Sequence, residues 1–101
     1  MGVAAWTPVA EEDLDDILFQ IAVVDGRPET AERIYGEIRD RANEHAARNL
    51  PPVKHPLAPS EWSYFRHKRW LLFYRLHTNG IEVMRLIDGV RDLPRQLPEN
   101  E

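Results

Sequence analysis

The chain contains no cysteine. This excludes disulfides, thiolate metal sites and cysteine nucleophiles, and it is compatible with a reducing compartment. No apolar run approaches the length needed to cross a bilayer, and no basic residues precede the first apolar stretch, so neither a membrane span nor a secretory signal is predicted. We expect a single cytoplasmic domain over residues 1–101, a size that can bury a core without covalent staples.

Acidic side chains are missing between Glu61 and Glu82, although the chain as a whole has a net charge of −4. Residues 1–52 carry eleven acidic and five basic side chains, whereas residues 53–101 carry six acidic and eight basic ones. The net charge argues against direct sequence-specific binding of nucleic acid. The uneven distribution predicts an acidic amino-terminal half and a mildly basic carboxy-terminal half.

Two amphipathic helices are predicted in the first half of the chain. Thr7 and Pro8 are typical of a helix cap and a first helical residue, and apolar residues follow at helical spacing from Ala10 to Ile21. Asp25-Gly26 ends this helix, and a second one with the same periodicity begins near Pro28. Pro51-Pro52 prevents its continuation, and four prolines mark residues 51–59 as a loop.

The second half predicts strands. Residues 62–65 and 70–77 are rich in aromatic and aliphatic side chains, and Asn79-Gly80 predicts a tight hairpin with a return strand over 81–87. With residues 3–6 as a weak first strand, the order indicates an α+β domain. Its helical hairpin would pack on an antiparallel sheet of three to four strands, followed by a short carboxy-terminal tail.

A two-residue Asn79-Gly80 loop fixes a predicted register in which Thr78 faces Ile81 and Tyr74 faces Arg85. One face of the hairpin then carries Leu71, Phe73, Met84 and Leu86, and the other carries Leu72, Tyr74, Leu76, Val83 and Ile87. Both faces are apolar, and the helical pair can cover only one of them. The second face is therefore expected to meet either a partner protein or the folded-back tail.

Several segments carry a resemblance to a known family. They are Trp6-Thr7-Pro8 with Asp13-Leu14, then Asp25-Gly26-Arg27-Pro28, and, most strongly, residues 70–75, 80–86 and 89–94. In order and spacing the chain resembles toxins of the RelE/ParE type, most closely the ParE branch. It departs from the family pattern at Ser63, Lys68 and Asp88, where relatives often carry arginine, glycine and histidine.

The resemblance implies the toxin of a type II toxin-antitoxin module, held silent by a ParD-like antitoxin. ParE-like toxins are associated with poisoning DNA gyrase, whereas RelE-like toxins cut messenger RNA on the ribosome. The last tyrosine here is Tyr74, and no aromatic residue follows Arg91, which argues against the ribonuclease because that activity often uses a carboxy-terminal tyrosine. We therefore expect a binding-type inhibitor rather than an enzyme. The alternatives are the ribonuclease and an inactive member that only binds its antitoxin.

The candidate residues follow from this interpretation. A toxin or partner surface is predicted at Arg66, Lys68, Arg69, Arg75, Arg85, Arg91 and Asp92. Antitoxin contacts are predicted at Leu71, Phe73, Met84 and Leu86. For Arg85 we prefer a structural role, stacked on Tyr74 and paired with a carboxylate such as Asp92, because an unpaired buried arginine is costly.

No catalytic residue, cofactor or metal is predicted. The acidic run from Glu11 to Asp16 lies in the first turns of a helix, where the helix dipole favours anions and helical spacing spreads the carboxylates over several faces. The four histidines match no zinc-binding spacing, and no glycine loop is suited to cradle a phosphate.

Overall fold

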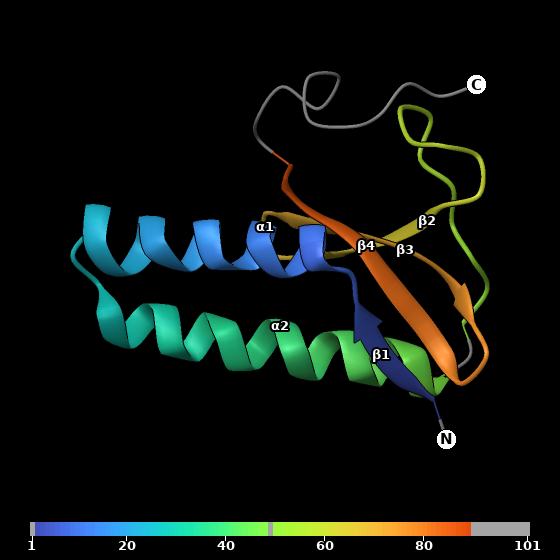
Figure 1. Ribbon diagram of the computed structural model, residues 1–101, viewed down its shortest axis with the longest axis horizontal. Helices are drawn as coiled ribbons and strands as arrows, with labels where there is room; N and C mark the ends of the chain where they lie inside the picture. The colour runs from blue at the N-terminus through green and yellow to red at the C-terminus, as the bar shows by residue number, and fades with distance from the viewer. Residues whose placement is uncertain (1, 49, 90–101) are drawn as a thin grey trace.

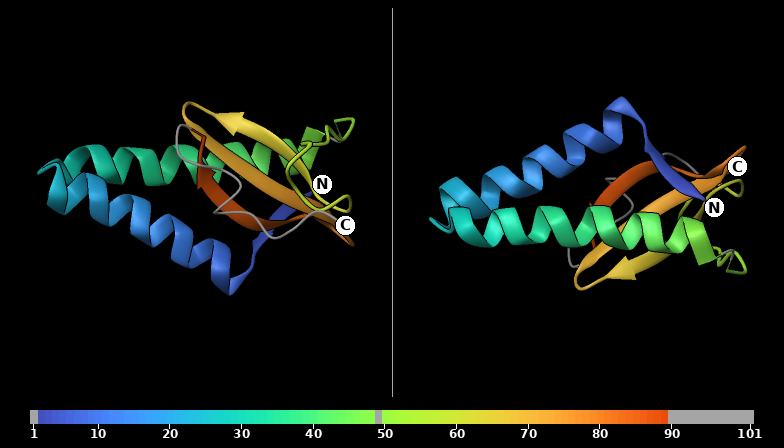
Figure 2. Two further views of the ribbon diagram at one scale, coloured as in Figure 1. Left: turned by 90° about the horizontal axis from the view of Figure 1, so that it is seen from above. Right: turned by 90° about the horizontal axis from the view of Figure 1, so that it is seen from below.

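The computed structural model describes residues 2–48 and 50–89. A helical hairpin packs on a mixed four-stranded sheet, and the tip of the hairpin projects beyond the sheet (Figures 1 and 2). The elements in chain order are β1 (Val3–Trp6), α1 (Pro8–Phe19), the π-helical turn η1 (Gln20–Val24), α2 (Pro28–Arg48), β2 (Ser63–His67), β3 (Trp70–His77) and β4 (Gly80–Asp88). The predicted α+β fold is confirmed.

The start and end of the first helix follow from local chemistry. The hydroxyl of Thr7 accepts a hydrogen bond from the backbone N–H of Ala10 at 3.0 Å and so caps α1. At the other end, η1 widens the last turn, and the N–H of Asp25 donates to the carbonyl of Gln20 at 2.9 Å. Gly26 then adopts a φ of 68°, which reverses the chain into α2 at little steric cost.

The strands are ordered β1-β4-β3-β2. β2, β3 and β4 form the predicted antiparallel meander, while β1 joins the free edge of β4 in the parallel sense. Gly80 lies where these two strands come closest, because a Cβ built on it would stand 2.2 Å from the carbonyl oxygen of Val3. Its φ of 144° also belongs to the region that side chains disfavour.

The predicted hairpin register is wrong. His77 pairs with Gly80, so the two loop residues are Thr78 and Asn79 rather than Asn79 and Gly80. A bulge then skips Met84, and Arg85 lies across from Phe73 instead of Tyr74. The predicted division of apolar residues between the two faces therefore fails for Leu86 and Ile87, which exchange faces. Glu82 pairs with Arg75.

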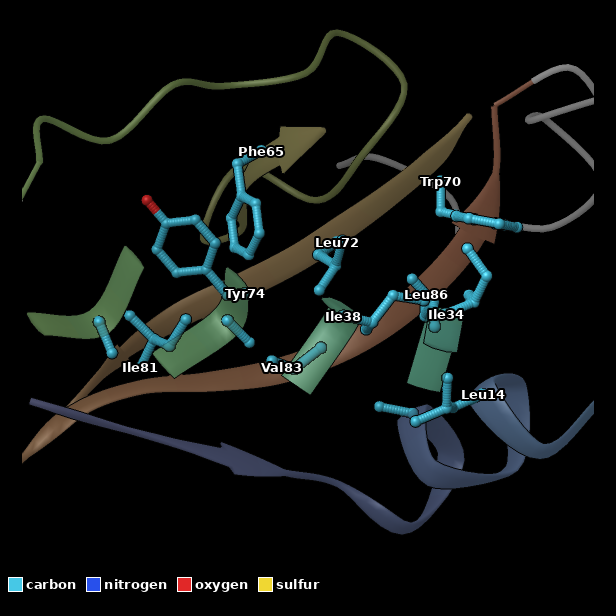
Figure 3. Packing of buried hydrophobic residues seen from close by; sticks show 13 residues of the cluster. Leu14, Ile34, Ile38, Phe65, Trp70, Leu72, Tyr74, Ile81, Val83 and Leu86 are labelled. Atoms are coloured by element: carbon cyan, nitrogen blue, oxygen red, sulfur yellow. The ribbon is translucent and has the colours of Figure 1, made fainter. Parts of the chain in front are cut away.

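Two apolar clusters lie on opposite faces of the sheet. The larger one joins Leu14, Ile34 and Ile38 of the helices to strand residues that Figure 3 shows pointing toward them: Phe65, Trp70, Leu72, Tyr74, Ile81, Val83 and Leu86. The smaller one joins Leu71, Phe73 and Ile87 to Ala58 of the proline-rich loop, with Trp62 and Tyr64 packed beside it. The second face is thus covered by this loop, and the tail that we considered as an alternative cover lies outside the described residues.

Candidate partner-binding surface

Arg85 is tied to the first helix by a bidentate ion pair. Its Nε donates to Oδ2 of Asp13 at 2.7 Å and its Nη2 donates to Oδ1 at 3.2 Å. The same Oδ2 accepts the backbone N–H of Leu86 at 3.0 Å. The carboxylate therefore satisfies the guanidinium and also a backbone donor of β4 beyond the end of β1. The predicted structural role of Arg85 fits this geometry, with Asp13 as a carboxylate partner; Asp92 lies outside the described residues.

Other arginines of the predicted toxin surface also have intramolecular partners. Arg69 donates from Nε and Nη2 to the two carboxylate oxygens of Asp88, at 3.1 and 2.5 Å, and this bonding raises the pKa of Arg69. Arg75 donates to Glu82 at 2.8 Å across the β3–β4 pair. Both arginine side chains are about half exposed, so these ion pairs stabilise the fold little. They do, however, pair each guanidinium with a carboxylate of the same chain.

The turn between β2 and β3 is anchored to the middle of α2. Oε1 of Glu37 lies 2.9 Å from Lys68 Nζ and 3.1 Å from His67 Nε2, and Oε2 of Glu37 lies 3.2 Å from Arg33 Nη1. The hydrogen bonds from Lys68 and His67 lower the pKa of Glu37 to about 2. Lys68 has a φ of 56°, a left-handed conformation that favours glycine, the residue often found at this position in relatives.

Arg66 is the exception among these cations. Arg66 is exposed, and it makes no ion pair within the described residues. Arg91 and Asp92 lie outside the described residues. The basic candidates therefore do not form one free cationic patch, since the fold pairs most of them with its own carboxylates.

The predicted antitoxin contacts are mostly inaccessible. Leu71, Phe73 and Leu86 are 1%, 0% and 2% exposed, and only Met84 is partly exposed. The prediction assumed an uncovered sheet face, whereas the proline-rich loop covers Leu71 and Phe73 and the helices cover Leu86.

Several accessible apolar side chains gather instead at the tip of the helical hairpin. Phe19, Val23 and Val24 are 59%, 61% and 60% exposed, and Tyr35 is 44% exposed. Between the two helices here lies an apolar groove, which we call the tip groove, lined by Leu18, Phe19, Ala22, Pro28, Ala31, Glu32 and Tyr35. A signal for it existed in the sequence, because Phe19 and Val23 are apolar residues that lie off the apolar stripe of the first helix.

A second hollow, an acidic cleft of about 670 Å³, lies between the first helix and the ends of β3 and β4. Its charged lining residues are Asp13, Asp16, Asp25, Asp88, Arg69 and Arg85. Two of these carboxylates are already neutralised by the two arginines, so Asp16 and Asp25 leave the cleft acidic. Phe19 lines both hollows and forms the ridge between them.

A buried histidine lies at the other end of α2. The Nε2 of His45 is 3.1 Å from the hydroxyl of Tyr74, and its ring stacks on Phe65 with centroids 4.2 Å apart. Burial lowers the pKa of His45, and Arg41 and Arg48 on the same helix lower it further. Burial also raises the pKa of Tyr74, so the last tyrosine of the chain is a neutral core residue, 1% exposed.

Within the described ranges, 2–48 and 50–89, no group of three or more histidine and acidic side chains is placed to hold a metal ion. In the same part of the chain, no helix has the length and apolarity needed to cross a membrane.

The fold, a helical hairpin on a mixed four-stranded sheet, is that of RelE/ParE-type toxins. A family model described as the ParE toxin of the type II toxin-antitoxin system, parDE, matches residues 4–93. The chain therefore belongs to the ParE toxin family.

A solved structure supports the same fold. The chain is similar to one from the chromosomal ParDE TA system of P. aeruginosa, with a TM-score of 0.69. Sequence identity is 20%, and the alignment covers 87% of this chain and 96% of that chain. No curated protein sequence matches the chain significantly.

Proposed function

We propose that this ParE-family toxin inhibits DNA gyrase by binding it and that a ParD-like antitoxin neutralises it. The family match over residues 4–93 is the observation that carries the proposal, because its description places such toxins in parDE modules. The structural neighbour, which belongs to a ParDE system, agrees with it.

Binding is favoured over messenger RNA cleavage by the position of Tyr74. A ribonuclease of the related type would need an accessible acid or base near the scissile phosphate. Tyr74 is buried against His45, and its raised pKa disfavours the charged form. Three arginines of the kind that stabilise a phosphoryl transition state, Arg69, Arg75 and Arg85, are held by Asp88, Glu82 and Asp13.

These ion pairs also rank the candidate residues for contact with the target. Arg66, exposed and without an ion pair among the described residues, is the first candidate, and Lys68 and Arg69 flank it at the same turn. Arg75, Arg91 and Asp92 stay secondary candidates. We assign Arg85 to folding rather than to contact with gyrase, because Asp13 holds it against α1.

The test is an assay of the purified chain on two targets. Gyrase supercoiling should stop, while ribosome-bound messenger RNA should stay intact and topoisomerase I relaxation should continue as the control. Arg66→Ala should weaken inhibition without lowering the unfolding midpoint, whereas the matched surface change Arg48→Ala should alter neither. Messenger RNA cleavage with gyrase unaffected would establish the ribonuclease, and binding of antitoxin with neither activity would establish an inactive member.

A further inference from the structure

Two polar atoms near the carboxy-terminal end of α2 are buried without a hydrogen-bond partner among the described residues. They are Nη1 of Arg41 and Nδ1 of His45. Buried side-chain nitrogens in folded proteins nearly always have a hydrogen-bond partner, and leaving one unpaired is costly, most of all in a charged group. Two such atoms in one place indicate a partner that the described residues do not supply.

Both atoms belong to side chains that pack on the same aromatic ring. The ring of His45 stacks on Phe65 with centroids 4.2 Å apart, and the guanidinium carbon of Arg41 is 4.9 Å from the centroid of the Phe65 ring. Phe65 lies beside Tyr74 in the main core, with ring centroids 5.9 Å apart (Figure 3). Arg41 and His45 are one helical turn apart, so they are neighbours on one face of α2. The two nitrogens therefore lie between α2 and β2.

The hydrogen bond to Tyr74 determines what Nδ1 of His45 can do. Nε2 of His45 is 3.1 Å from the hydroxyl of Tyr74. Burial lowers the pKa of His45, and Arg41 and Arg48 lower it further, so at neutral pH the imidazole is uncharged and carries one proton. A phenol hydroxyl is a good donor, so Nε2 accepts its hydrogen bond and the ring proton lies on Nδ1. His45 thus presents an N–H donor, as Arg41 does.

The carboxylates nearest to Arg41 along α2 already have other partners. Glu37, one turn before it, is bonded to Lys68, and Glu44, one turn after it, is 3.3 Å from Arg48. Arg41 itself forms no ion pair within the ranges that the structure describes, although it is partly buried. A partly buried cation without a counter-charge favours an anion as the acceptor, because an anion supplies both the hydrogen bond and the compensating charge.

We propose that Arg41 and His45 form a binding site for a small monovalent anion of the chloride type, which accepts hydrogen bonds from the guanidinium Nη1 and the imidazole Nδ1 beside Phe65. The anion neutralises Arg41 and fastens the last turns of α2 to β2, at the end of the hairpin opposite its tip (Figure 1). The site uses none of the residues assigned to contact with gyrase or antitoxin, so it is independent of the proposed function.

The first experiment measures the thermal unfolding of the full chain while chloride replaces gluconate at constant ionic strength. Gluconate serves as the non-binding anion because it is too large for a site between two neighbouring side chains. A ligand that binds only the folded state raises Tm, here by roughly 4 °C or more once chloride exceeds its Kd about tenfold. Chloride NMR reports binding directly: the protein should broaden the chloride signal, and nitrate should reverse the broadening by competition.

The variant Arg41→Met removes the charged donor but keeps an unbranched side chain over Phe65. Its Tm should no longer depend on chloride, and its Tm in gluconate should equal or exceed that of the parent because an uncompensated cation has been removed. Arg33→Met is the matched control. Arg33 is on the same helix, its side chain is 58% exposed and it is paired with Glu37, so this variant should keep the full response to chloride.

Nitrogen NMR of the His45 ring locates the anion without any substitution. Adding chloride to the parent chain should shift the signal of Nδ1 more than that of Nε2, and an unmoved Nδ1 signal would overturn the proposal even if Arg41→Met failed to fold. Equal Tm in chloride and gluconate with an unbroadened chloride signal would also overturn it and assign the two donors to water. A chloride response that survives Arg41→Met would place the anion elsewhere on the protein and refute the site.

Discussion

Replacing Asp13 by alanine should destabilise the protein more than any other single removal of a carboxylate from α1. The carboxylate accepts three hydrogen bonds, two from Arg85 and one from the backbone N–H of Leu86. The variant would leave a partly buried guanidinium and a backbone donor of β4 without this acceptor. Both losses carry a desolvation penalty in addition to the lost bonds.

The magnitude follows from the exposure of the pair. Breaking a fully buried pair costs about 3–5 kcal/mol. Here 25% of the Arg85 side chain and 16% of the Asp13 side chain remain exposed, so water compensates part of the loss. We expect a decrease of about 2–3 kcal/mol in the free energy of unfolding, equivalent to a fall in Tm of roughly 10 °C or more for a domain of this size.

The assay is urea unfolding followed by circular dichroism, with Asp15→Ala as the matched control. Asp15 is on the same helix, is exposed, and makes no ion pair within the described part of the chain, so its variant should lie within about 0.5 kcal/mol of the parent. A double-mutant cycle with Arg85→Ala should give a clear coupling energy. If Asp13→Ala and Asp15→Ala had the same unfolding midpoint, the pair would contribute nothing and our assignment of Arg85 to folding would be refuted.

Two further predictions concern stability. His45 has a lowered pKa in the folded state, so its contribution to the free energy of unfolding is complete above the ordinary pKa of 6.5 and is lost as the pH falls toward the folded pKa. His45→Gln should therefore flatten this part of the curve of stability against pH. An unchanged slope would contradict the assignment of His45 as a buried neutral histidine. Glu37, whose pKa is lowered to about 2, stabilises the fold fully above its ordinary value of 4.5, and this contribution is lost as the pH falls toward 2, so its window begins at lower pH than that of His45. Gly80→Ala should lower the free energy of unfolding by at least about 2 kcal/mol, because its Cβ would meet the Val3 carbonyl. Gly36→Ala, in open space on α2, should raise the free energy of unfolding by about 1 kcal/mol. Equal melting temperatures for the two variants would show that β1 can shift freely.

The elements of the fold could be predicted because their signals are local. Thr7-Pro8 caps and begins the first helix, Asp25-Gly26 separates the helices, and Asn79-Gly80 marks the hairpin, and each of these acts within a few residues of itself. The hairpin register could not be predicted in this way. Gly80 is drawn into the strand by its close approach to Val3, which is remote in sequence, and the bulge at Met84 has no local signature.

The candidate site was predicted less well, for a related reason. Arg85 was correctly expected to need a carboxylate, but Asp13 is 72 residues away, and only the tertiary fold brings the two together. The apolar residues of both strands were correctly expected to need cover. The proline-rich loop was interpreted only as a connection, although Ala58 within it is 1% exposed and closes the second face.

These corrections change where partners are expected to act. A basic strand half and an acidic helical half predict two docking surfaces of opposite charge only if the charges are free. On the sheet, Arg69 and Arg75 are bonded to Asp88 and Glu82, whereas on the first helix most carboxylates have no such partner among the described residues. Among the described residues, Asp15 and Asp16 of α1 therefore remain without an ion pair, and Phe19, which is 59% exposed, follows them on the same helix.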